Sequence, residues 1–115
     1  MHELSIAINI IEIAEQHARE SNAICVKKVE LEIGQLAGVV IEAMNFALEE
    51  AVKDTLLENA EFIIHSLTPQ ARCKMCDTIF QLDDYFSPCP ACNKVDFDII
   101  QGKELQIKSI QIERK

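Results

Sequence analysis

Two cysteine pairs are the feature that most limits how this chain can fold. Cys73 and Cys76 form one Cys-x2-Cys pair, and Cys89 and Cys92 form the other. Each pair can sit on a tight turn that presents two thiolates to one ion, so two turns supply the four tetrahedral sulfur ligands that zinc favours. Because the protein then fills every coordination position, we predict a structural ion rather than a catalytic one. The spacing favours zinc but leaves iron open, because a rubredoxin-like iron site uses similar ligands.

Other interpretations of the thiols fit less well. Paired disulfides need an oxidising compartment, and the chain does not begin with the basic segment and apolar stretch of a secretory signal. A thioredoxin-type redox motif comes as a single pair at the start of a helix. We therefore expect reduced, metal-binding thiols in a cytoplasmic protein. The fifth cysteine, Cys25, stands alone, and we expect it to be a small hydrophobic residue of the core.

Composition argues against two classes of function. Hydrophobic residues make up 49% of the chain and charged residues 26%, values typical of a globular protein. The net charge is -8, so the chain would repel nucleic-acid phosphates at long range. No segment approaches the roughly 18 apolar residues that a membrane-spanning helix needs. We expect neither a nucleic-acid partner nor a membrane.

Two helices are predicted in the first half of the chain. An apolar stripe at helical spacing indicates a helix over residues 4–19, with Leu4 and His17 on its buried side. A second apolar face indicates another helix at about 40–53.

Three strands are also predicted. Alternating apolar and polar residues indicate half-buried strands over 26–33 and 60–67, the second with His65 on its solvated side. The alternation restarts in the last segment of the chain and shifts phase at Ser109 and Ile110, which a β-bulge would explain.

Between the second and third strands the pattern changes, because short segments, prolines and the four cysteines replace long periodic runs. A segment this short cannot hold itself together by apolar burial alone. The final strand needs a sheet to join, and the other long strands lie before the cysteines. We therefore predict an α+β fold: a small three-stranded sheet with two helices on one face, plus an inserted four-cysteine, zinc-ribbon-like module. The predicted domains are residues 1–68 together with 102–115, and residues 69–101.

The opening Met1-His2-Glu3 offers a second set of metal ligands. A bulky residue after Met1 usually prevents its removal, so a free amine should lie within chelating reach of the His2 imidazole. Amine, amide and imidazole nitrogens can together form a square plane that suits nickel(II) or copper(II). A lone histidine near a terminus is often incidental, so the residues alone leave this site open.

Four segments together resemble the HypA/HybF family of hydrogenase maturation factors. They are the opening residues 1–5, the strand end 31–34, the two cysteine pairs and the closing residues 105–110. The resemblance covers the whole chain. Members of that family are nickel metallochaperones that work with a GTPase, HypB, to deliver nickel to the precursor of the large subunit of [NiFe]-hydrogenase. In some bacteria they also serve urease.

The resemblance implies a nickel site at Met1, His2 and Glu3, with the Met1 amine, the His2 amide and imidazole, and the Glu3 amide as ligands. It also implies zinc at the four cysteines. This sequence departs from some members near the start of the second helix, where it has Val40 in place of an acidic residue and Glu42 is the nearest substitute. Some members carry histidines beside the cysteine pairs, and this chain does not.

The sequence leaves the choice of function among three candidates. A nickel carrier is favoured by the resemblance, and a zinc-ribbon adaptor or regulator without nickel transfer is the alternative. A small electron-transfer protein with iron at the cysteines is the third. We expect no enzymatic activity of its own, because no Ser/His/Asp set or phosphate-binding loop is present. The oligomeric state, monomer or homodimer, stays open.

Overall fold

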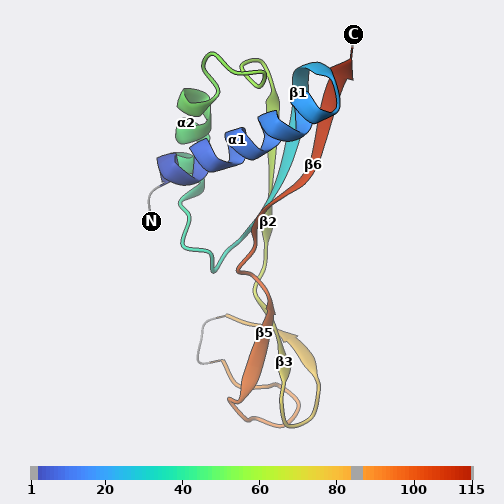
Figure 1. Cartoon of the computed structure of the whole chain (residues 1–115). Helices are drawn as coiled ribbons and strands as arrows, with labels where there is room; N and C mark the ends of the chain where they lie inside the picture. The colour runs from blue at the N-terminus through green and yellow to red at the C-terminus, as the bar shows by residue number, and fades with distance from the viewer. Residues whose placement is uncertain (1–2, 84–86, 115) are drawn as a thin grey trace.

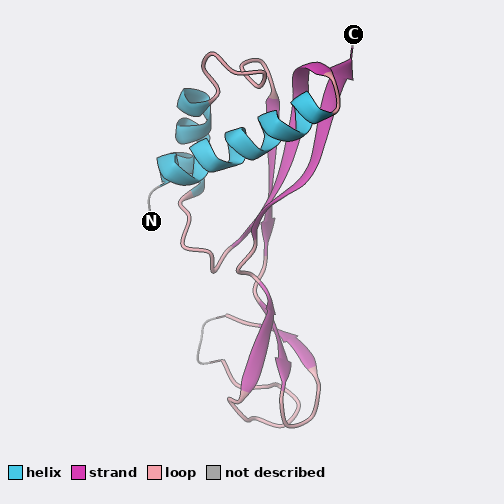
Figure 2. Ribbon diagram, in the orientation of Figure 1, coloured by secondary structure: helices cyan, strands magenta, loops and turns pink. Residues whose placement is uncertain are grey.

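We describe residues 3–83 and 87–114 of a computed structural model of the chain (Figure 1). The elements of these residues are α1 (Glu3–Glu20), β1 (Ala23–Gly34), α2 (Ile41–Ala51), β2 (Glu61–Leu67), β3 (Gln70–Cys73), β4 (Ile79–Gln81), β5 (Phe97–Gln101) and β6 (Leu105–Arg114). The molecule is elongated, with principal extents of 56 × 25 × 16 Å and both helices at one end (Figure 2). In the described part of the chain, no helix is long and apolar enough to cross a membrane.

Strand β1 is the centre of the first sheet. β2 pairs with one edge of β1 in parallel, and β6 pairs with the other edge in antiparallel orientation. The second sheet has the order β4-β3-β5 and is built from the chain between β2 and β6. The predicted α+β fold is therefore confirmed: both helices cover one face of a three-stranded sheet, and the cysteine module is inserted before the last strand (Figure 1).

The main hydrophobic core lies between the helices and the sheet face that they cover. Ala7, Ala14 and Ala18 on α1 are at most 1% exposed, and their small side chains let the helix lie close to the sheet. Larger side chains of β1 and α2 fill the remaining space. The buried residues of this core are Ala7, Ile10, Ile11, Ala14, Ala18, Val26, Val29, Leu31, Ile33, Met44, Ala47, Leu48, Val52 and Leu57.

A bulge in β1 brings two valines that are three positions apart to the same face of the sheet. Val26 and Val29 are both buried in the core although they lie three positions apart, whereas a regular strand alternates its faces. The register with β6 shifts between Val26 and Lys28, so Lys27 is an extra residue without a partner opposite. Because of the bulge, the side chain of Val26 points to the core, on the same face as Val29.

A second bulge explains the phase shift predicted near the C-terminus. Ile107 and Ile110 both pack against the core, because Lys108 is an extra residue of β6 opposite β1. The predicted bulge therefore exists, one residue before Ser109. β6 is an edge strand, and a bulge that carries a lysine is a common way for an exposed edge to resist pairing with another chain.

Two expectations for side chains of α1 are wrong. His17 is exposed rather than buried, and Leu4 is 51% exposed. The buried stripe follows the alanines, and His17 lies beside it, where α1 passes the edge strand β6. Its side chain lines an open cleft of about 610 Å³ between these two elements. The helical period was predicted correctly, but the narrow sheet covers a narrower stripe than the sequence suggests.

The expectation that Cys25 belongs to the core is also wrong. The next residue, Val26, points to the core, so the side chain of Cys25 points to the other face of β1. Its Sγ lies 3.4 Å from Oε2 of Glu113 on β6. Partial burial, followed by this contact with a carboxylate, raises the pKa of the Cys25 thiol.

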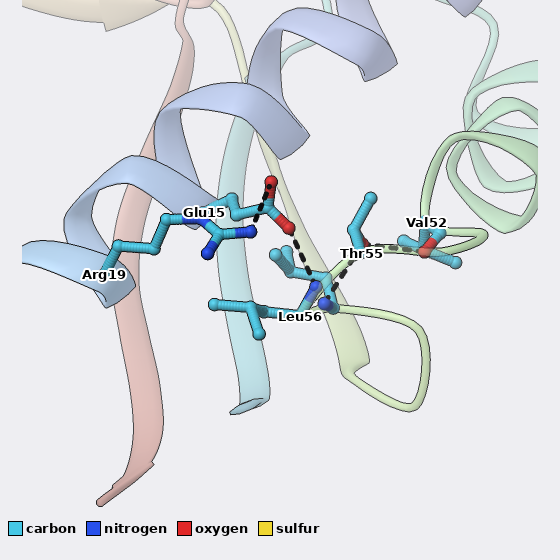
Figure 3. Close-up of polar contacts among 6 residues, drawn as sticks. Glu15, Arg19, Val52, Thr55 and Leu56 are labelled. Carbon is cyan, nitrogen blue, oxygen red and sulfur yellow. Dashed lines mark hydrogen bonds and ion pairs between the residues drawn. The ribbon is translucent and has the colours of Figure 1, made fainter. Parts of the chain in front are cut away.

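A carboxylate of α1 holds the loop that follows α2 (Figure 3). Oε2 of Glu15 accepts a hydrogen bond of 2.8 Å from the Leu56 N–H, and Oε1 lies 3.5 Å from the Arg19 guanidinium. The Thr55 hydroxyl donates to the Val52 carbonyl at 2.7 Å. Side chains thus satisfy polar backbone groups that have no strand partner, and the loop is fixed against α1.

Two glycines allow the loop after β1 to meet the start of β6. A Cβ added to Gly34 would lie 2.0 Å from the carbonyl carbon and oxygen of Gly102. The Leu36 N–H donates to the Gly102 carbonyl at 2.7 Å, and the Gly34 N–H donates to the Glu104 carbonyl at 2.8 Å. Gly102 also has a φ of 124°, which glycine adopts far more readily than other residues. Backbone contact at this crossing therefore links the two sheets.

We expect Gly34→Ala to lower the free energy of unfolding by more than about 3 kcal/mol, because the new Cβ has no space and the backbone must move. Thermal unfolding followed by circular dichroism measures this loss. Gly38→Ala is the matched control. Its φ is 76° but no described atom lies within 4 Å of the added Cβ, so the cost should be about 1 kcal/mol. Equal losses in both variants would contradict the close approach.

Candidate metal centre

Two turns with matching backbone hydrogen bonds present the four cysteines. In the first, the Cys73 N–H donates to the Thr78 carbonyl at 2.9 Å, and the Asp77 N–H donates to the Cys73 carbonyl at 2.9 Å. In the second, the Cys89 N–H donates to the Lys94 carbonyl at 2.8 Å, and the Asn93 N–H donates to the Cys89 carbonyl at 2.7 Å. The two halves of the site are thus built alike.

Each turn ends on a residue in the left-handed conformation. Asp77 has a φ of 61° and Asn93 a φ of 62°. Asp and Asn tolerate this conformation better than other residues with a side chain. They follow Cys76 and Cys92, at positions that sequence reasoning considered only as places where some relatives carry histidine. The sequence signal for their backbone role is that both pairs are followed by Asp or Asn.

The four sulfur atoms are close enough to share one ion. All four Sγ atoms lie within 4.8 Å of one another, with 3.4 Å between Cys73 and Cys92 and 3.6 Å between Cys76 and Cys89. Tetrahedral metal–sulfur bonds of about 2.3 Å place the sulfurs about 3.8 Å apart, so the cluster fits an ion of the size of zinc. The sulfurs are too far apart for a disulfide bond of about 2.05 Å, and all five cysteines are free.

The thiols of the cluster differ in their pKa. The Thr78 hydroxyl, 3.2 Å from the Cys76 sulfur, and then the Thr78 backbone lower the pKa of Cys76 to about 6. The backbone of Lys94 lowers the pKa of Cys92, but burial and the neighbouring thiols outweigh it and raise that pKa to about 12. One thiolate forms easily while its neighbour keeps a proton, because adjacent sulfur charges repel. A divalent cation would offset this repulsion.

The cysteine module has a small core of its own. The rings of Phe80 and Phe97 meet edge to face, with 5.8 Å between their centroids. Two of the five buried residues are themselves proposed metal ligands, so the apolar core and the metal site are one structure. The buried residues are Ala71, Cys73, Phe80, Leu82 and Cys89.

The structure describes part of the predicted nickel site. Met1 and His2 lie outside the described residues. Glu3 is the first residue of α1, and its Oε2 accepts a hydrogen bond of 3.2 Å from the Val40 N–H. Glu42, the other acidic candidate, is exposed in the first turn of α2. Among the described residues, the four cysteines are the one group of three or more His, Cys, Asp or Glu side chains placed to hold an ion.

His65 lies partly exposed on the polar side of its strand, as predicted, but it is also paired with a carboxylate, which sequence reasoning missed. Its Nε2 lies 2.9 Å from Oε1 of Glu30, and the Ser109 hydroxyl donates to Oε2 of Glu30 at 2.6 Å. The hydrogen bonds from Ser109 and then from His65 hold the pKa of Glu30 below its usual value. These residues lie on three adjacent strands, on the sheet face away from the helices. The sequence placed His65 on the polar side of its strand, but the pairing depends on a register that only the structure gives.

Residues 1–112 match the model of a protein family described as "Hydrogenase/urease nickel incorporation, metallochaperone, hypA". The chain belongs to this family. The hydrogenase maturation factor HypA of Parabacteroides distasonis is 45% identical over 115 residues, the full length of both chains. The factor of the same name from Geobacter metallireducens is 38% identical over 113 residues, which cover 98% of this chain and all of that one.

Two solution structures of HypA proteins share the fold. The Ni metallochaperone HypA from Helicobacter pylori matches over all of both chains with a TM-score of 0.73 and 24% identity. Another HypA protein matches all of this chain and 98% of its own with a TM-score of 0.77 and 24% identity. At that identity the matches bear on the fold alone. The resemblance to the HypA family seen in the sequence is thus confirmed, and the family is one of nickel metallochaperones for enzyme maturation.

We expect the four-cysteine cluster to hold about one metal ion per chain, and Cys76→Ala to lose it. Binding of the ion supplies folding free energy to a module with so small a core, so the variant should unfold in this module while both helices persist. Plasma emission measures the metal, and amide NMR spectra report the two modules separately. Cys25→Ala, outside the cluster, is the control. Unchanged metal content in Cys76→Ala would contradict the assignment.

Proposed function

We propose that this protein is a nickel metallochaperone, which binds Ni(II) at its N-terminus and delivers it for the maturation of [NiFe]-hydrogenase. The observation that carries this proposal is the match of residues 1–112 to the HypA family, whose description names nickel incorporation into hydrogenase and urease. Urease is accordingly the second possible client. The protein is a carrier in this proposal and not an enzyme, and it acts as a monomer or a homodimer.

The proposed nickel ligands are the Met1 amine, the His2 amide and imidazole, and the Glu3 amide. Four nitrogens in a plane suit Ni(II). Two of these ligands are amides that must lose protons, and the positive end of a helix favours such anions. Glu3 begins α1, which puts its amide at that end. Because the ligands are consecutive at a chain end, nickel can be released by moving a few residues.

We infer that the ion of the four-cysteine cluster is zinc(II) and that its role is structural, because the cysteines fill all four ligand positions. Residues 69–101 form the zinc-binding domain in this proposal, and residues 1–68 with 102–115 form the nickel-binding domain. Zinc(II) has no visible absorption, so a coloured protein would indicate iron instead. The reduced thiols that this site needs are maintained in the cytoplasm, where we place the protein.

The proposed partners are a HypB-type GTPase and the precursor of the large subunit of [NiFe]-hydrogenase. We expect a pull-down with the purified GTPase to recover a complex when nickel is present. The sequence has no phosphate-binding loop of its own, so GTP hydrolysis in this scheme belongs to the partner. Absence of a complex both with and without nickel would contradict this partnership.

A zinc-ribbon adaptor without nickel transfer is the alternative function. It would share the cysteine cluster and the fold, so neither of them distinguishes the two functions. The N-terminus does, because the carrier alone needs a free amine next to His2. Nickel titration of zinc-loaded protein with a native N-terminus therefore separates the two functions.

We predict that nickel binding weakens as the pH falls below about 7. The amine has a reference pKa of about 7.7 to 8.0 and the imidazole of about 6.5. Both bind nickel only when deprotonated, so protons compete with the metal as the pH falls through these values. The loss of two amide protons on binding steepens the dependence. Calorimetric titration across this pH range measures it.

His2→Ala, and separately one extra residue before Met1, should each abolish this binding while zinc content and thermal stability stay unchanged. The extra residue converts the amine to an amide and so removes one ligand. His17→Ala is the matched control, since His17 is an exposed histidine of α1 that is not among the proposed ligands. If both terminal variants bind nickel as tightly as the parent, the terminal site is wrong.

A further inference from the structure

Helix α2 begins without a capping side chain of its own. Its N-cap residue is Val40, and no side-chain cap hydrogen bond is made there within the described residues. In a capping box, a Glu or Gln three residues after the N-cap accepts a hydrogen bond from the N-cap N–H, but this position is Ala43. The Val40 N–H donates instead to Oε2 of Glu3 on α1, at 3.2 Å. Glu3 therefore accepts the hydrogen bond that a Glu at the third helical position accepts in a capping box, but it does so from a different helix.

The position of Glu3 in the chain gives this contact a second consequence. Glu3, whose amide is itself a proposed ligand, directly follows Met1 and His2, which supply the other proposed nickel ligands, and it is the first residue of α1. Chain termini are poorly ordered unless a contact ties them down. The bond to Val40 ties the Glu3 side chain to the start of α2. It therefore fixes the position of the residue that directly follows Met1 and His2 in the chain.

We propose that the Glu3 side chain is a positioning residue for nickel, acting through the Val40 N–H rather than as a ligand. The inference rests on the terminal nickel site proposed above. It gives the carboxylate a role distinct from that of the Glu3 amide. Holding the chain in place before nickel arrives reduces the conformational entropy that binding must remove, and so tightens binding. The contact uses a backbone N–H, so it does not depend on an acidic side chain at position 40.

A second contact on α1 supplies the comparison that tests this role. Glu15 accepts a hydrogen bond from the Leu56 N–H at 2.8 Å, in the loop after α2 (Figure 3). The two carboxylates therefore hold backbone amides on either side of α2, one before the helix and one after it. Only Glu3 is adjacent to the nickel terminus. If Glu3 merely docked α2 onto α1, loss of Glu15 should weaken nickel binding as well.

The first experiment removes the hydrogen-bond donor and leaves Glu3 in place. Val40→Pro deletes the N–H, and the φ of -85° at Val40 lies near the range of proline. The Val40 side chain is 60% exposed, so Val40→Ala is made alongside to measure its separate contribution. We expect Val40→Pro to bind nickel about tenfold more weakly than Val40→Ala, the scale of one hydrogen bond to a charged group. Equal affinities, with both variants folded, would overturn the proposal.

A second set of variants keeps the proposal testable if Val40→Pro does not fold. Glu3→Ala should weaken nickel binding about as much as Val40→Pro, and the double variant should be no weaker than either single one. Glu3→Gln keeps an oxygen acceptor for the Val40 N–H, so it should recover most of the affinity. Glu15→Ala should leave nickel affinity unchanged. Glu3→Gln as weak as Glu3→Ala, or Glu15→Ala as weak as both, would reject the positioning role.

All affinities are measured by calorimetry on zinc-loaded protein with a native N-terminus, and melting temperatures are recorded for every variant. The chain with one extra N-terminal residue is titrated in parallel. If that chain binds nickel as the parent does, the terminal site itself fails. If it loses nickel while Glu3→Ala binds nickel as tightly as the parent and Val40→Pro as tightly as Val40→Ala, the site stands and the positioning role of Glu3 is overturned. We expect the extended chain to lose nickel, Val40→Pro and Glu3→Ala to bind it about tenfold more weakly, and Glu15→Ala to bind it as the parent does.

Discussion

The pairing of the last strand with the first is the interaction on which the rest of the structure depends. β6 completes the sheet around β1 and brings Ile107, Ile110 and Ile112 onto the core. Without it, β1 would keep one partner, and two strands rarely make a stable sheet. The same pairing makes the cysteine module an insertion, since the chain leaves the first sheet after β2 and returns to it at β6. Folding of the first module thus requires contacts between the two ends of the sequence, which are slow to form.

The two modules gain their stability from different interactions. The first buries apolar side chains from two helices and a sheet, with alanines that bring α1 close to β1. The second buries a much smaller set, and two of those residues are cysteines of the cluster. Its like-charged thiolates would repel one another without a cation, so the proposed ion and the fold of this module would depend on each other. Backbone contacts at the crossing of Gly34 and Gly102 join the two modules.

The sequence predicts the periodic parts of the fold and the spacing of the cysteines, because both follow from local rules. The two helices, the long strands, the insertion and the bulge near Ser109 could all be read from the pattern. His17 and Cys25 could not, because their burial depends on the width of the sheet and on the bulge at Lys27. The contact of His65 with Glu30 depends on register between strands. These features arise from tertiary packing, which no short window of sequence contains.

The hydrogen bond between Glu3 and Val40 was unpredictable for a related reason. Helix-capping rules are local, and they look for a cap within the helix that needs one. At the start of α2 that search finds Val40 and Ala43, so the sequence suggests a poorly capped helix. The acceptor lies on another helix, at the N-terminus of the chain. Glu3, which we propose as part of a nickel site, thus has a structural role that the sequence motif does not reveal.

The two metal sites proposed for this chain would each need to favour a different ion, and their donor atoms and geometry would provide the means. A tetrahedral cage of four sulfurs suits zinc, whereas a square plane of nitrogens suits nickel(II). Accessibility differs as well. Cys73 and Cys89 are at most 1% exposed, whereas Cys76 is exposed and Cys92 is half-buried, so the core of the module would hold two of the four ligands of a bound ion. The proposed nickel ligands are consecutive at a chain end and can release their ion through local motion. An ion held by the core of a module suits permanent occupancy, and an ion held by a terminus suits transfer.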